Sequence, residues 1–262
     1  MRDYGQRAFA EATLLDDAGC VAHTEGVRAF SLGPVEALPG PLTVDDDLLG
    51  ELDLRRRTTL RLGEDGHWRL GEPDSAGQKR HGCSGPLGDL FFHGLRLVPG
   101  TTGSQEETFF NNWVAGHAPG YYRSRNGGVH RGGITGENNV DLTVVADAEL
   151  TEDEIRANSL LLYGTPATNA IVQRFASELP VGFDADAVHL AGQTFAAPGV
   201  AVFAIFPHPL NPERYVAVHG GSTPDAICWG SHLDMHLLPD YLVYAGGEVL
   251  QWGFFDSDWR LP

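Results

Sequence analysis

The chain has 262 residues, of which 42% are hydrophobic and 20% are charged, so it can bury a substantial core and is not intrinsically disordered. Its 35 acidic residues against 18 basic ones give a formal charge of −17 at pH 7, which disfavours phosphate backbones and predicts no nucleic-acid partner. No apolar run approaches the roughly 20 residues of a membrane span, and no signal-peptide pattern is present. Three widely spaced cysteines are typical of reduced thiols, so we expect a cytoplasmic protein without a membrane partner.

The first 136 residues are predicted to form a β-rich N-terminal part. We expect residues 1–50 to be irregular apart from a strand over 26–32, because glycine and proline recur there. Residues 57–62 alternate in polarity, 63–66 form a turn and 67–70 return, which predicts a β-hairpin with a four-residue loop. A polar loop over 71–80 and a strand within 90–98 follow.

A capping box, Ser104 with Glu107 three residues later, predicts the start of a helix that continues to Ala115. Residues 116–136 contain seven glycines and should be irregular. A loop of that length is usually functional or mobile, and we expect it to bridge or cover the junction with the next domain.

An α/β domain is predicted over residues 137–262. Apolar strands are expected at 140–146, 160–163, 200–206, 215–219 and 241–244. A second capping box, Thr151 with Glu154, starts a short helix, and a helical stripe covers 171–179. The order strand, turn, helix, strand is typical of βαβ units, so we predict a mostly parallel, Rossmann/flavodoxin-like sheet.

Ligands of open α/β sheets bind beyond the carboxyl ends of the strands, so the residues after each strand are candidates. After strand 160–163, Thr165 or Thr168 can cap the next helix, whose N–H groups would favour an anion. Plain helix capping, without a ligand, is the alternative interpretation.

A second candidate cluster surrounds the strands that end near residues 206 and 219. It offers a base, an amide and a cation in His208, Asn211, Arg214, His219 and Ser222. The alternative is structural: Asn211 can tie its own turn through side-chain hydrogen bonds, and Arg214 can pair with an acid.

Lys79 is the only lysine among the 18 basic residues. A compact ammonium has a tunable pKa, which suits a pocket, although Lys79 could equally be an ordinary surface residue. Cys83, next to a histidine in HGCSG, is a candidate nucleophile, with a small buried thiol as the alternative. No G-x-S-x-G motif occurs, so a Ser-His-Asp hydrolase of the usual form is not expected.

The segment SHLDMH places His232, Asp234 and His236 at spacings that could bring them to one face of a strand. Exposed polar residues are the alternative. Without a third anchor or a zinc-family pattern, we predict neither a metal nor a cofactor, and the role of these three residues stays open.

From about residue 52 onward, the order of motifs resembles the C-terminal module of large bacterial, planctomycete-type proteins of the prolyl-oligopeptidase-like or esterase-like α/β-hydrolase class. The matching stretches are KRHGCSGPLGD, FHGLRLVPGT, VADAELTEDEIRANSLLLYGTPATN, HPLNPERYVAVHGG and GFFDSDW. His208 departs from the pattern, which has Asn there. The resemblance implies an α/β-hydrolase-associated fold, and it places Lys79, Asp89, Asn169, Asn211, Arg214 and Tyr215 on motif positions.

Together these features predict an enzyme acting on a small polar metabolite by hydrolase-like or lyase-like acid–base chemistry. Lys79 would be the cation or general acid, and Asp89 or His219 the base. The substrate would be held by Thr165, Asn169, His208, Asn211, Arg214 and Ser222. The alternative is a non-catalytic binding or accessory module that partners a separate α/β-hydrolase. The oligomeric state stays open.

Overall fold

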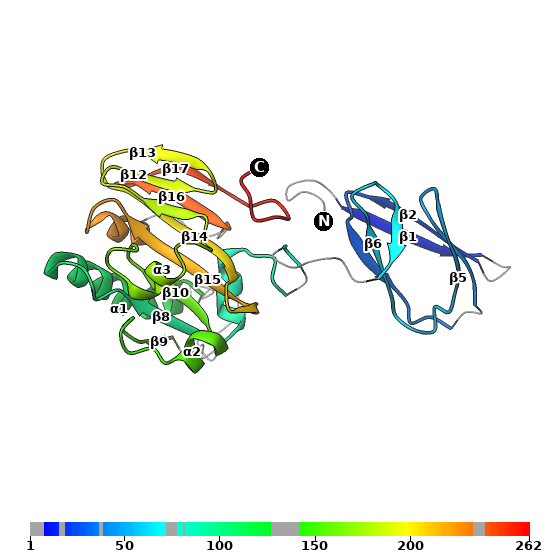
Figure 1. The fold of residues 1–262 in the computed structure, drawn as a ribbon, viewed down its shortest axis with the longest axis horizontal. Helices are drawn as coiled ribbons and strands as arrows, with labels where there is room; N and C mark the ends of the chain where they lie inside the picture. The colour runs from blue at the N-terminus through cyan, green and yellow to red at the C-terminus, as the bar shows by residue number, and fades with distance from the viewer. Residues whose placement is uncertain are drawn as a thin grey trace. The chain divides into compact units, whose positions relative to one another are not determined.

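In the computed structural model, the described residues are 8–15, 19–36, 39–71, 78–80, 82–126, 142–232 and 239–262. The chain forms two compact units (Figure 1): unit 1 comprises residues 1–80 with 256–260, and unit 2 comprises 81–255 with 261–262. The predicted domain boundary at 136/137 lies outside the described residues. The described part holds seventeen strands and three α-helices.

Unit 1 consists of two small sheets. The first has the order β1-β2-β4-β5, and the second has the order β3-β6-β7. Their bounds are β1 Phe9–Leu14, β2 Cys20–Glu25, β3 Ala29–Leu32, β4 Gly40–Val44, β5 Asp47–Leu52, β6 Thr58–Leu62 and β7 Trp68–Leu70. The predicted hairpin is confirmed, because β6 and β7 pair antiparallel across the turn at 63–66.

The prediction that residues 1–50 are irregular is wrong. Strand β2 buries Cys20 and Ala22, and β4 buries Leu42 and Val44, so each strand turns alternate side chains into the core of unit 1. Glycine and proline obscure this two-residue period in the sequence. Leu60 completes the core at 0% exposure.

Residues 256–260 return to unit 1 and close it. The Lys79 backbone N–H donates to the Ser257 carbonyl at 2.8 Å, and the Gln78 side-chain amide donates to Asp258 at 2.7 Å. Arg28 donates to the Ser257 hydroxyl at 2.6 Å. The Lys79 ammonium lies 4.9 Å from the centroid of the Trp259 ring, a cation–π contact.

Unit 2 is built on a seven-stranded sheet of order β17-β16-β14-β15-β10-β8-β9. The bounds are β8 Leu95–Pro99, β9 Thr143–Val144, β10 Ser159–Tyr163, β14 Val200–His208, β15 Asn211–Gly221, β16 Tyr241–Ala245 and β17 Glu248–Gly253. A separate three-stranded sheet consists of β11 Val181–Phe183, β12 Ala187–Leu190 and β13 Gln193–Ala196. Every residue of β10 is buried, which explains its unbroken apolar sequence.

The predicted mostly parallel, Rossmann/flavodoxin-like α/β sheet is wrong, and so is an α/β-hydrolase-like fold. Only β9, β8, β10 and β15 run parallel; β14, β16 and β17 are antiparallel to their neighbours. The physical reason is the link between β14 and β15, which is only Pro209 and Leu210. A two-residue link can join antiparallel strands, whereas parallel neighbours need a crossover of a dozen or more residues.

The α-helices are α1 Gln105–Asn126, α2 Glu152–Ala157 and α3 Ala170–Arg174, and short 3₁₀ segments span Leu87–Phe92 (η1) and Ala226–His232 (η3). Both predicted capping boxes are confirmed. Helix α1 continues past Gly116 to Asn126, so the prediction of irregular structure from 116 is wrong over that stretch. No described helix is long and apolar enough to cross a membrane.

Candidate ligand-binding site

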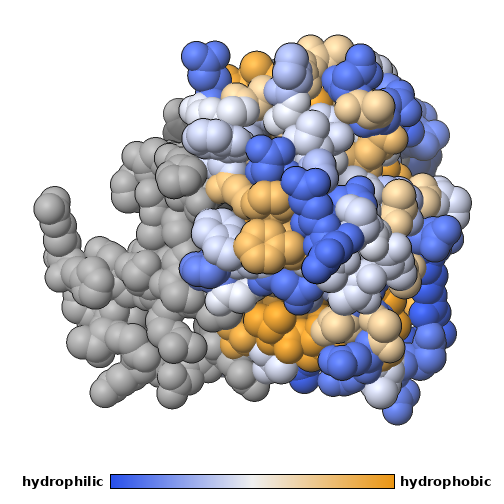
Figure 2. Space-filling model, turned by 90° about the vertical axis from the view of Figure 1, so that its left-hand side faces the viewer, coloured by the Kyte–Doolittle hydropathy of each residue, from blue (hydrophilic) through white to orange (hydrophobic). Residues whose placement is uncertain are grey.

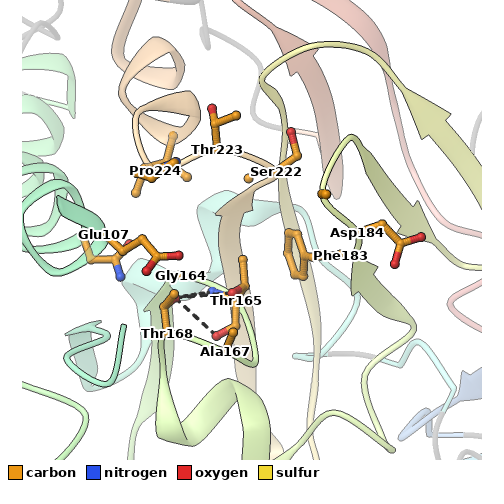
Figure 3. A pocket seen from close by; sticks show the side chains of 14 residues that line it. Glu107, Gly164, Thr165, Ala167, Thr168, Phe183, Asp184, Ser222, Thr223 and Pro224 are labelled. Carbon is orange, nitrogen blue, oxygen red and sulfur yellow. Dashed lines mark hydrogen bonds between the residues drawn. The ribbon is translucent and has the colours of Figure 1, made fainter. Parts of the chain in front are cut away.

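A pocket of about 250 Å³ lies wholly within unit 2, where the parallel strands β10 and β15 end (Figure 3). Four segments form its walls: the start of α1, the loop after β10, the turn between β11 and β12, and the segment from the end of β15 into η3. The lining residues are Glu107, Asn111, Gly164, Thr165, Ala167, Thr168, Phe183, Asp184, Ala185, Gly221, Ser222, Thr223, Pro224 and Ile227.

The sheet topology accounts for the position of the pocket. Strands β8 and β10 are parallel neighbours, but the chain leaving β8 returns to this sheet at β9 on one side, and the chain leaving β10 returns to it at β14 and then β15 on the other. Connections that leave in opposite directions open a crevice beyond the strand ends, the usual ligand position in such sheets. The prediction that a site lies after strand 160–163 therefore agrees with this pocket.

The loop after β10 is held by its own hydrogen bonds. The Thr165 N–H donates to the Thr168 hydroxyl at 2.9 Å, and the Thr168 N–H donates to the Thr165 carbonyl at 3.0 Å. Gly164 has φ of +121°, and a Cβ there would lie 2.5 Å from the Thr168 hydroxyl. Only glycine fits this position, so the floor of the pocket is preformed.

Asn169 does not face a ligand. Its side-chain oxygen accepts from the Ile171 and Val172 N–H groups, and its amide donates to the Val98 and Tyr163 carbonyls. Residue 169 is fully buried. It therefore caps α3 and ties α3 to β8 and β10.

Asp147 occupies the remaining free donor at the start of α3, because its carboxylate accepts from the Ala170 N–H at 2.7 Å. The same carboxylate accepts from the Thr101 N–H and hydroxyl. With Asn169 on the next two donors, the α3 N-terminus is satisfied by the chain's own acceptors. The N–H groups at the start of α3 are therefore not available to the anion that the sequence predicted after strand 160–163.

Glu107 brings a carboxylate to the pocket. One of its oxygens accepts from the Ser104 N–H at 2.7 Å, as the capping box requires, and the other has no hydrogen-bond partner among the described residues. Figure 3 shows the carboxylate directed into the pocket. Asp184 also lines the pocket, but its carboxylate is turned away and pairs with His189 at 2.7 Å.

The end of β15 closes the opposite side of the pocket. A Cβ at Gly220 would lie 2.5 Å from the Gly164 carbonyl and 2.7 Å from the Phe183 ring, so glycine allows both to pack against β15. Ser222, predicted to bind substrate, lines the pocket. Its hydroxyl is buried and has no partner among the described residues, and its N–H donates to the Val200 carbonyl at 2.8 Å.

His219, predicted as a base, is buried beside the pocket and does not line it. Its Nε2 is 2.6 Å from the Tyr244 hydroxyl, and its ring stacks on Phe203 at 4.9 Å. The Tyr244 hydroxyl donates to the Ile227 carbonyl at 3.3 Å, which leaves Nε2–H as the donor to Tyr244. Burial lowers the pKa of His219 to about 3, so its imidazole is neutral at pH 7.

His208, Asn211 and Arg214 lie at the other end of β15, because β14 and β15 are antiparallel. Asn211 donates to the Arg156 carbonyl at 2.6 Å and Arg214 to the Ala157 carbonyl at 2.9 Å, so both cap the end of α2. The His208 Nδ1 accepts from the Leu210 N–H, and burial lowers its pKa. The expected single cluster with His219 and Ser222 is therefore split between two ends of the sheet.

Asp89 accepts a hydrogen bond from the Tyr215 hydroxyl at 2.9 Å, and that hydroxyl accepts from the Gly85 N–H at 3.2 Å. Burial raises the pKa of Tyr215.

Cys83 is buried, with 3% exposure, as expected if it is a small buried thiol and not a nucleophile. Neither Asp89 nor His219 lines the pocket, and Lys79 belongs to unit 1.

No protein-family model and no curated protein sequence matches this chain. Among the described residues, no group of three or more His, Cys, Asp or Glu side chains could hold a metal ion. Asp234 and His236 lie outside the described residues, as does the His232 side chain.

Sequence reasoning missed Glu107 and Phe183 as pocket residues. Glu107 was recognised only as a capping residue, and a capping box gives no sign of where the second carboxylate oxygen points. Phe183 lies in a small sheet that the sequence pattern did not predict.

Proposed function

We propose that the chain is a binding module that takes a small polar ligand in the pocket at the ends of β10 and β15, the non-catalytic alternative stated above. The observation that carries this proposal is the pocket itself: a preformed hollow at the topological switch point of the sheet, lined by hydroxyls, carboxylates and the apolar residues Phe183, Pro224 and Ile227.

The positions of the predicted catalytic residues favour binding over acid–base chemistry. A general base must reach the proton it abstracts. His219 is buried, neutral and hydrogen-bonded to Tyr244. The Asp89 carboxylate accepts from the Tyr215 hydroxyl, and neither Asp89 nor His219 lines the pocket.

Two further parts of the proposal rest on the sequence. We place the protein in the cytoplasm, in agreement with cysteines 20, 83 and 228, which are thiols and not disulfides. The resemblance to hydrolase-associated modules supports a separate hydrolase as a partner, and co-purification from the native organism would test it.

The Ala167→Trp variant tests the pocket. Ala167 is exposed on the pocket wall, so an indole there should fill the hollow without disturbing the core. We expect a set of polar metabolites, screened by saturation-transfer NMR, to contain compounds that bind the wild-type chain and lose at least tenfold in affinity with the variant. Ala148→Trp, on an exposed turn outside the pocket, is the matched control. Equal binding by both variants would overturn the proposal, and so would turnover of a bound compound.

A further inference from the structure

We propose that the ligand carries a protonated amine and that Glu107 is its counter-charge; this inference rests on the proposed function. The evidence for an amine ligand is the charge of the residues that line the pocket. The lining residues include two carboxylates and no lysine, arginine or histidine. These carboxylates would repel an anionic ligand, whereas a cation would meet an attractive field in a partly water-excluded hollow.

The geometry of Glu107 suits an ammonium group. The capping bond to Ser104 uses one carboxylate oxygen and fixes the side chain, so the second oxygen is held in place facing the pocket. A positioned acceptor loses little side-chain freedom on binding. Charge-assisted N–H···O bonds to such a carboxylate are about twice as strong as bonds between neutral groups.

The hydroxyl oxygens of the pocket can also accept hydrogen bonds from an ammonium group. The Thr223 hydroxyl donates its proton to Asp225 at 2.8 Å, so only its lone pairs remain for a ligand. An ammonium group has three donors and no acceptor. Phe183, Pro224 and Ile227 form an apolar wall for the carbon skeleton of the ligand. A single inward carboxylate is too small a ligand set for Ca²⁺ or Zn²⁺, so an organic cation fits better than a metal ion.

Figure 2 shows one face of the molecule, on which apolar and hydrophilic side chains are interspersed. The kind of ligand is indicated by the residues that line the pocket and not by this surface.

The test compares amines with neutral counterparts of the same shape by isothermal titration calorimetry on the full chain. The pairs are tyramine with tyrosol, glucosamine with glucose, and 4-aminobutanol with 1,4-butanediol. We expect at least one amine to bind and to exceed its counterpart tenfold or more in affinity. If no amine binds, or if each alcohol binds as tightly as its amine, the inference is wrong.

Glu107→Gln supplies the matched variant. Glutamine also completes a capping box, so the helix start should persist while the charge is lost. We expect amine affinity to fall at least tenfold with Glu107→Gln and to stay unchanged with Glu106→Gln, an exposed neighbour outside the pocket. An unchanged affinity for Glu107→Gln contradicts the inference. If neutral compounds bind, and Ala167→Trp abolishes their binding while Glu107→Gln does not, the inference of an amine ligand is wrong but the proposal of a ligand-binding pocket stands.

Discussion

Burial decides what His219 can do. A histidine after a strand is a reasonable candidate base in a sequence, but this one stacks on Phe203 and bonds to Tyr244 with 5% exposure. A residue type reveals which proton transfers are chemically available. It does not reveal whether solvent or a ligand can reach the ring, because that depends on tertiary packing such as that of Gly230 in η3 against the His219 ring.

His219→Phe should reduce the loss in free energy of unfolding that the wild type shows at acidic pH. Above the ordinary pKa of 6.5, His219 is neutral in both folded and unfolded chains. Between pH 6.5 and about 3 the unfolded chain binds a proton that the folded chain cannot, so stability falls as the pH drops. At pH 5 this loss is about 2 kcal/mol.

Urea unfolding at pH 7 and pH 5 measures the effect within each variant, so any fixed cost of the substitution cancels. The His117→Phe variant, at an exposed position of α1, should keep the wild-type response. A His219→Phe variant that loses as much stability as the wild type between these pH values would show that His219 is protonated in the folded chain.

The motif positions of the resemblance are informative at the residue scale, although not as the predicted site. Asn169, Asn211 and Arg214 all bond to backbone groups at helix ends, and Tyr215 bonds to Asp89. Each therefore contributes to the fold. Sequence reasoning could find them as polar residues at strand ends, but it could not separate caps from ligands, because both uses favour the same residue types.

At the scale of elements, local signals predicted well and pairing directions did not. The hairpin, both capping boxes and most of the apolar strands follow from short-range patterns and lie where predicted. The strand predicted at 140–146 is short, Thr143–Val144, and the helix predicted over 171–179 already ends at Arg174. Whether β14 and β15 run parallel depends on how far each strand extends. Three prolines between residues 207 and 212 suggested a long turn, yet Pro207 and Pro212 lie inside the strands next to a register shift. The turn is only two residues long, and it reverses the direction of the chain, so β14 and β15 are antiparallel.

The bond between Tyr215 and the segment around η1 gives a prediction at this scale. Tyr215→Phe removes the acceptor of the Gly85 N–H and the donor to Asp89. We expect a cost of about 1–3 kcal/mol and faster hydrogen exchange over residues 85–90. Tyr241→Phe, which loses one bond from Gln251, is the control and should leave that exchange unchanged. Unaltered exchange in Tyr215→Phe would mean that other contacts hold the segment.

At the scale of the whole molecule, the two compact units have separate cores. Leu60 is fully buried in unit 1 and Leu161 in unit 2. Each substitution by alanine should cost about 2–5 kcal/mol in its own unit. Hydrogen exchange resolved by peptide should show Leu60→Ala loosening unit 1 alone and Leu161→Ala loosening unit 2 alone. Equal loosening of both units by either variant would indicate one cooperative structure.

The return of residues 256–260 to unit 1 has a consequence for synthesis on the ribosome. Arg28, Gln78 and Lys79 leave the exit tunnel early, but their partners at Ser257, Asp258 and Trp259 are translated 180 to 229 residues later. The nascent strands of unit 1 therefore lack these partners while nearly all of unit 2 is made. Unit 1 therefore receives its closing segment only after residues 81–255 of unit 2 have been translated.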